Sequence, residues 1–150
     1  MSNANRVGAN TPTQFGAYAL ASARGISLAA TGNAIANLAF IGGGLSNSGS
    51  TATSGQAIVR DIVVRNPSAN ISTTTISIGY SSDGANLWAN NQTLSTLTAI
   101  NKYQNLVLSA TANTTCMNGN VSSVLYVNVN SNVVANATCD IYVFGELVAP

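Results

Sequence analysis

Few side chains in the sequence are suited to catalysis. The 150 residues include no histidine, so Ser-His-Asp, Cys-His and His-metal arrangements are excluded. The four carboxylates are Asp61, Asp83, Asp140 and Glu146. Asp140 and Glu146 lie about 20 Å apart if they share one strand, whereas the paired carboxylates of a glycosidase lie within about 10 Å. A carboxylate pair drawn from two different strands stays open, but we expect no enzyme, no catalytic residue and no cofactor.

The two cysteines, Cys116 and Cys139, are also candidates for chemistry. Their spacing permits a disulfide, but free thiols are typical of a chain that folds in a reducing cytoplasm. Without histidine or a second cysteine pair, they cannot form a zinc site by themselves, so no metal is expected. We predict that both are reduced and that Cys139 is buried in phase with Ile141 and Val143.

Three aromatic residues could stack on a sugar: Trp88, Tyr80 and Tyr103. Trp88 is the single tryptophan of the chain. A lone tryptophan in a protein with few aromatic residues is more typical of a core or interface anchor, because its large apolar surface fills a wide gap. We therefore favour an anchor role for Trp88 and keep glycan contact as the alternative.

The composition is poor in charge and rich in small polar residues. Only 6% of the residues are charged, against about 25% in an ordinary soluble protein, and the mean hydropathy is +0.25. Asn, Ser and Thr keep the surface hydrated in place of charge. The net charge is +1 and the five cations are scattered, so the electrostatic pattern of a nucleic-acid binder is missing. A chain this close to neutrality has little colloidal repulsion, which favours a subunit of an assembly.

The sequence has neither a membrane span nor a leader pattern. It contains no run of about 18 apolar residues, which a membrane-spanning helix needs. The residues 1–6 lack the basic start and apolar run of a signal peptide. We therefore expect no membrane partner and synthesis in a cytoplasm.

The elements that must position these residues are strands. Runs rich in β-branched residues alternate with turn residues at short intervals, and no fixed repeat is present. Two or three short strands are predicted within 17–40, a surface loop follows over 41–56, and further strands are predicted at 58–65, 72–80, 87–88, 94–100, 103–110, 124–129 and 137–148. Together they predict an all-β, antiparallel two-sheet sandwich of jelly-roll or Ig-like type, with 17–150 as a single domain.

Three segments of this chain resemble one family. The segments 58–68, 78–86 and 139–147, within a resemblance that spans 57–148, are similar to small β-sandwich structural proteins of tailed bacteriophages, including capsid decoration (cement) proteins. The resemblance implies a virion protein that is made in the host cytoplasm and binds the outside of the capsid. There it would clamp neighbouring copies of the major capsid protein, commonly as a homotrimer. No catalytic residue is carried over from the family.

The N-terminal residues 1–16 are predicted to be an extended arm. Its apolar residues are chiefly Val7 and Phe15, so packing on its own sandwich would recover little of the roughly 1 to 2 kcal/mol per residue lost in ordering a backbone. We expect the arm to cross onto a neighbouring decoration or capsid subunit, with Arg6, Val7 and Phe15 in contact.

Two alternatives stay open. The first is a carbohydrate-binding jelly-roll module of a head fibre or receptor-binding tip, with its contacts at Trp88, Tyr80 or Tyr103. The second is another virion component, such as a tail, neck or minor capsid protein. The sequence does not separate these from a decoration protein, because only their position in the particle differs.

Overall fold

The computed structural model describes residues 18–39, 56–80, 82–84, 87–109, 117–118 and 124–148, and within these ranges every regular element is a strand. The strands are β1 (Tyr18–Ser27), β2 (Gly32–Ala39), β3 (Gln56–Arg65), β4 (Thr75–Gly79), β5 (Leu87–Thr93), β6 (Tyr103–Asn105), β7 (Met117–Asn118), β8 (Val124–Ser131) and β9 (Thr138–Val148). In the described part of the chain no helix is long and apolar enough to cross a membrane.

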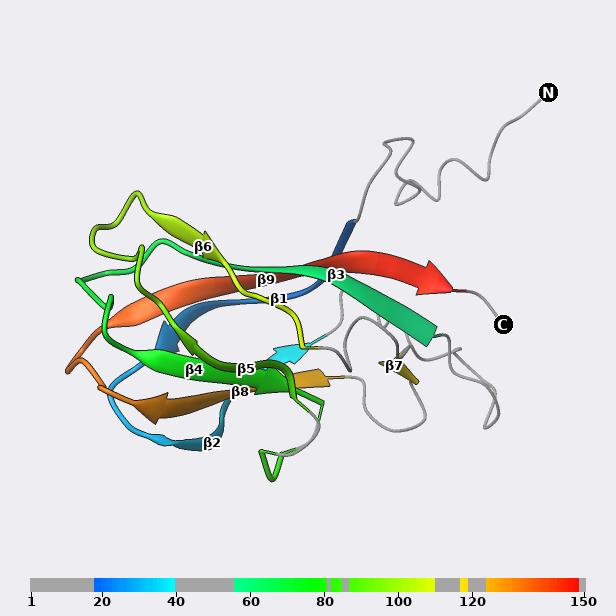
Figure 1. Ribbon diagram of the computed structural model, residues 1–150, viewed down its shortest axis with the longest axis horizontal. Coiled ribbons are helices and arrows are strands. Elements are labelled where there is room, and N and C mark those ends of the chain that lie inside the picture. The colour runs from blue at the N-terminus through cyan, green and yellow to red at the C-terminus, as the bar shows by residue number, and fades with distance from the viewer. Residues whose placement is uncertain are drawn as a thin grey trace.

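The strands form two antiparallel sheets that pack face to face (Figure 1). The first sheet has the order β1-β9-β3-β6, and β7 also pairs with β3. The second sheet has the order β2-β8-β4-β5. The predicted all-β, two-sheet sandwich is confirmed. Backbone hydrogen bonds from Leu28 N to Ala137 O (2.9 Å) and from Val134 N to Leu28 O (3.2 Å) tie the turns before β2 and before β9 together at one end of the sandwich.

The core lies between the sheets and follows the predicted alternation. In β8 the buried apolar side chains are Leu125, Val127 and Val129, and in β9 they include Ile141 and Val143. Two-residue periodicity places such residues on one face, where their burial provides most of the stabilising free energy. Trp88 is the largest fully buried side chain, so its role is that of a core anchor.

The second sheet departs from simple alternation at its inner strand β4. Ile76 and Ile78 face the core, yet Ser77 between them is only 2% exposed. Strand β4 lies between β8 and β5, and asparagine side chains from both neighbours approach Ser77. Its polar face is therefore covered by other polar side chains.

Some predicted strand boundaries are wrong. The segment 94–100 is not a strand but a set of turns, in which Leu97 N donates to Leu94 O and Leu94 N donates to Thr74 O, both at 2.9 Å. Leu94 and Leu97 are both fully buried, and their spacing of three suits a turn, whereas a strand buries every second residue. Strand β4 begins only at Thr75 because a turn precedes it, and β6 ends at Asn105.

The two strands within 17–40 are β1 and β2, which agrees with the prediction of two or three. The predicted arm 1–16, with Arg6, Val7 and Phe15, lies outside the described residues, as do Cys116 and residues 41–55 of the predicted loop 41–56. Positive backbone φ values of 46 to 59° occur at four asparagines and one alanine, namely Asn66, Asn91, Asn132, Asn136 and Ala34. Asparagine tolerates this left-handed conformation better than most residues, so part of the asparagine content serves turns and bulges.

Candidate functional site

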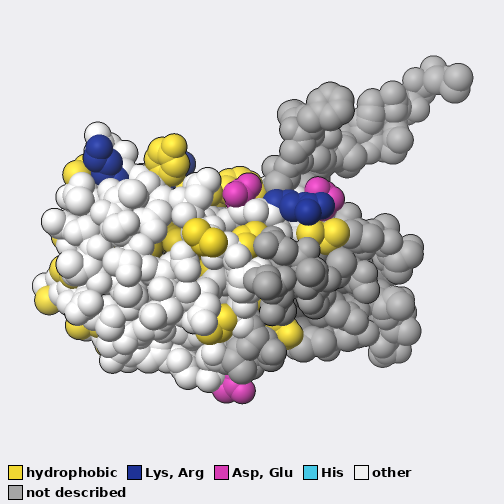
Figure 2. Space-filling model, in the orientation of Figure 1, with side chains coloured by type: hydrophobic (Ala, Val, Ile, Leu, Met, Phe, Trp, Pro, Cys, Tyr) yellow, Lys and Arg dark blue, Asp and Glu magenta, His cyan; other side chains and the backbone are white. Residues whose placement is uncertain are grey.

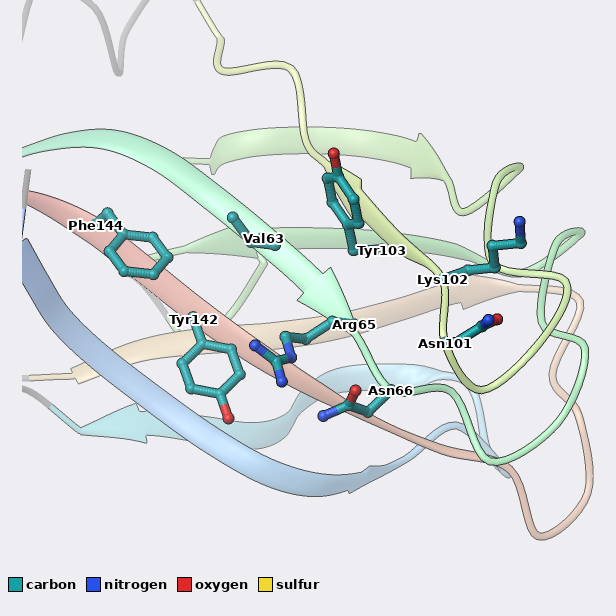
Figure 3. Close-up of a pocket in the computed structure, with 8 residues that line it drawn as sticks. All are labelled: Val63, Arg65, Asn66, Asn101, Lys102, Tyr103, Tyr142 and Phe144. Carbon is teal, nitrogen blue, oxygen red and sulfur yellow. The ribbon is translucent and has the colours of Figure 1, made fainter.

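The outer face of the first sheet carries a hollow of about 610 Å³, which we call the aromatic hollow (Figure 3). Residues from β3, β6, β9 and the loop before β6 line it: Val63, Arg65, Asn66, Asn101, Lys102, Tyr103, Tyr142 and Phe144. The lining combines three aromatic rings, two cations and two amides. This mixture of apolar surface with a few polar groups is typical of a binding site.

Strand register brings these side chains together. Val63 lies opposite Tyr142 in the β3–β9 pair, and Arg65 lies opposite Tyr103 in the β3–β6 pair. Because alternate residues of a strand point to the same face, all four side chains project outward from the first sheet. The buried residues Ile62 and Val64 occupy the inward phase of β3 and support the hollow from below.

Arg65 is held within this hollow by an aromatic ring. Its guanidinium carbon lies 5.4 Å from the centroid of the Tyr142 ring, which is within the range of a cation–π contact. Among the described residues Arg65 makes no ion pair, whereas Arg60 pairs with Glu146 at 3.2 Å. The guanidinium of Arg65 therefore keeps its fork of N–H donors for another partner.

Asp140 lies opposite Arg65 in the sheet, but its oxygens are bonded elsewhere. Oδ1 accepts a hydrogen bond from Gly25 N at 2.9 Å, and Oδ2 accepts one from Asn66 Nδ2 at 2.8 Å. The second of these bonds holds the side chain of Asn66 just after β3, where the backbone of Asn66 is left-handed. The carbonyl oxygen Oδ1 of Asn66 remains as an acceptor beside the hollow.

Tyr103 forms the opposite side of the hollow and is 65% exposed. Side-chain hydrogen bonds fix the short strand that carries it: Thr96 Oγ1 donates to Tyr103 O at 2.9 Å, and Gln104 Nε2 donates to Thr93 O at 2.7 Å. An exposed tyrosine on a fixed backbone is preorganised for contact, because little backbone entropy is lost when it binds.

The outer face of the second sheet has a different chemistry, and we call it the amide face. Ser77 Oγ accepts hydrogen bonds from Asn130 Nδ2 at 2.7 Å and from Asn91 N at 2.8 Å, and Asn130 Nδ2 also reaches Asn91 Oδ1 at 3.2 Å. Asn128 Oδ1 accepts from Ala34 N at 2.7 Å. In Figure 2 the charged side chains lie mostly along the side of the molecule formed by the first sheet, and the rest of the visible described surface is largely uncharged.

The structure does not bring the three predicted sugar-stacking residues together. Trp88 is fully buried and meets Tyr80 edge to face, with ring centroids 6.1 Å apart and an interplanar angle of 78°. Within the described residues, its buried Nε1 has no hydrogen-bond partner. Tyr103 lies on the other sheet and is the exposed member of the three.

Cys139 is a free, buried thiol, as predicted. Burial raises the pKa of the Cys139 thiol to about 12, and the negative charge of Asp140 adds to the rise. The thiol is therefore neutral at pH 7, which makes it a poor nucleophile. Across the described ranges, no group of three or more His, Cys, Asp or Glu residues could hold a metal ion.

Sequence reasoning missed most of the aromatic hollow. Tyr103 was a candidate, but Tyr142, Phe144, Arg65 and Lys102 were not. A signal for two of them was present, because Tyr142 and Phe144 interrupt the polar phase of β9 and indicate that this face is covered. In the structure both rings are only half-buried.

Comparison with known proteins identifies no relative: no protein-family model, curated protein or solved structure matches the chain. The two outer faces of the sandwich differ in their chemistry, and this difference bears on the function of the chain. The outer face of the second sheet carries an uncharged network of hydrogen bonds, and the outer face of the first sheet carries the aromatic hollow with its two cations.

Proposed function

We propose that this chain is a non-enzymatic structural protein of a virion, which binds the outer surface of a tailed-phage capsid and stabilises contacts between major capsid subunits. The resemblance of 57–148 to small phage sandwich proteins supports this role. The observation that carries the proposal is the amide face, an uncharged and internally bonded surface over the second sheet.

The amide face suits a contact between protein subunits. Ser77, Asn91 and Asn130 already satisfy one another, so packing a partner over them leaves few polar groups unpaired. No charge must be removed from water, which is the large cost of burying ionic surface. Association through such a face should also depend little on salt, because screening acts on charges.

Repetition on a lattice makes a modest contact sufficient. Each capsid offers many equivalent sites. Once one subunit of a homotrimer is bound, the other subunits meet their sites at a high effective concentration, so the trimer binds more tightly than one subunit does without any new type of contact. We propose a homotrimer because near-zero net charge favours association, and homo-oligomers mostly have closed symmetry. Contact of the arm 1–16 with a neighbour stays a prediction.

Imaging of the virus particles that carry this chain tests the proposal. Cryo-electron microscopy should show many symmetric copies on the icosahedral shell, with the second sheet toward the major capsid protein. Sedimentation of the purified chain should give a trimer at micromolar concentration. A few copies confined to the tail or neck would favour the alternative virion roles and overturn the capsid assignment.

Retention on the shell gives a second, independent measurement. Particles washed at low and at high salt should keep equal amounts of the chain, because the proposed contact is uncharged. Replacing Asn130, an exposed member of the amide face, with Lys should release the chain, while Lys at the exposed Asn105 of the first sheet is the matched control. Equal retention of both variants would contradict docking through the second sheet.

A further inference from the structure

The aromatic hollow selects for a negatively charged occupant. Arg65 and Lys102 supply two of the five cations in the sequence, and its lining includes no carboxylate. Asp140, the nearest acid in the sheet register, accepts hydrogen bonds from Gly25 N and Asn66 Nδ2. A ligand that carries a carboxylate would therefore meet a guanidinium that has no ion pair among the described residues.

The guanidinium of Arg65 matches the shape of a carboxylate, in addition to attracting its negative charge. The Tyr142 ring packs against its guanidinium, and Figure 3 shows the guanidinium between Tyr142 and Asn66. A guanidinium held in this way presents parallel N–H donors that match the two oxygens of a carboxylate. Holding it in advance also reduces the entropy lost on binding.

The remainder of the hollow is suited to a sugar ring. Tyr103 offers an exposed aromatic face, and Val63 and Phe144 add apolar surface on which the C–H groups of a saccharide can pack. Asn66 Oδ1 and the Asn101 amide supply hydrogen-bonding groups for hydroxyls. The volume of about 610 Å³ lies within the range of small-ligand sites. A stable protein interface is instead defined by its buried area, which extends over many more residues than line this hollow.

We propose that the aromatic hollow binds a carboxylated sugar, such as a uronic or sialic acid unit, with its carboxylate on Arg65 and its ring against Tyr103. Lys102 at the rim adds positive potential that attracts the anion. This site is separate from the amide face, so it does not depend on the capsid role.

Calorimetric titration of the full chain tests the site with defined probes. Sialyllactose and a glucuronic-acid disaccharide carry the carboxylate, and lactose is the neutral control. At least one carboxylated probe should bind at least about tenfold more tightly than lactose. Absence of binding by both acidic probes at millimolar concentration, or equal binding of lactose, would overturn the proposal.

Variants assign the binding to particular residues. Arg65→Ala and Tyr103→Ala should each weaken binding about tenfold or more, and Arg65→Lys should restore only part of it because the fork is lost. Arg60→Ala is the matched control, since it removes the same charge from the same strand at a residue outside the hollow. Circular dichroism and thermal unfolding verify that each variant is folded.

The same variants separate this site from other roles. If Arg65→Ala binds the acidic sugar as well as the parent chain does, the hollow is not the site. Tighter binding of a Glu-rich peptide than of either sugar would overturn the sugar assignment in favour of a protein partner. Retention of Arg65→Ala on capsids should be unchanged, so a failure here leaves the capsid proposal to its own test.

Discussion

The two outer faces of the sandwich show how one alternating pattern produces different surfaces. On the amide face, Ser77, Asn91 and Asn130 have complementary donors and acceptors and bond to one another. On the first sheet, Tyr142, Phe144 and Arg65 have few mutual hydrogen bonds to make and leave a hollow. Polar residues that hydrogen-bond to each other close a sheet face, whereas aromatic rings with cations leave it open for a ligand.

Substitution of Gly145 by Ala should cause the largest loss of stability, because it acts at the contact between two strands of the first sheet. A Cβ at this position would collide with the backbone carbonyl oxygen of Ile58 and with the Leu20 side chain, so β3 and β9 would have to separate. We expect the free energy of unfolding to fall by about 3 kcal/mol or more.

Urea denaturation measures this change, and Gly25→Ala provides the control. Among the described residues a Cβ at Gly25 meets no atom within 4 Å. The left-handed backbone of Gly25 (φ of 64°) opposes the substitution, so that loss should be about 1 kcal/mol. If Gly145→Ala is as stable as the parent chain, close approach of these strands does not shape the first sheet.

Alkaline pH should weaken the first sheet through Cys139. Its pKa is raised from 9.0 to about 12 in the folded chain, so the unfolded chain loses this proton first as the pH rises. The stabilisation is complete below pH 9.0 and is lost between pH 9.0 and about 12, by about 1.4 kcal/mol per pH unit.

Denaturant unfolding at several pH values measures that slope. Cys139→Ala is the control, since it lacks the thiol and should lose less stability per pH unit over the same range. Identical slopes for the two chains would show that the buried thiol does not contribute to the pH dependence.

Ser77→Ala should destabilise the amide face by about 1 to 3 kcal/mol. The substitution removes the acceptor for Asn130 Nδ2 and Asn91 N, and it does so at a position that is only 2% exposed. Thermal unfolding measures the change. A neutral result would mean that water replaces the hydroxyl and that the face is less closed than its hydrogen bonds indicate.

Tyr103→Ala should have the smallest effect on stability, within about 0.5 kcal/mol, because the side chain is 65% exposed. Thermal unfolding of the Tyr103→Ala and Ser77→Ala variants under the same conditions compares the loss of stability at the two faces. A loss for Tyr103→Ala as large as that for Ser77→Ala would show that the hollow is a structural part of the sandwich instead of an open surface.

The fold class and much of the core follow from the pattern of residues along the chain. Period-two alternation identified the inward phases of β8 and β9, including Cys139, because a half-buried strand must place apolar residues at every second position. It failed at 94–100, where Leu94 and Leu97 are buried through turns with a spacing of three. Local pattern cannot distinguish these cases when apolar and β-branched residues are mixed.

Which side chains of different strands share a face depends on the order of the strands in the folded sheets. Arg65, Tyr103 and Tyr142 belong to three strands that are far apart in the sequence, and the order β9-β3-β6 makes them neighbours. In the same way, Ser77 is buried because β4 lies between two strands whose asparagines reach over it. The alternation along one strand predicts which of its residues point outward, but the order of the strands determines which side chains of neighbouring strands they contact.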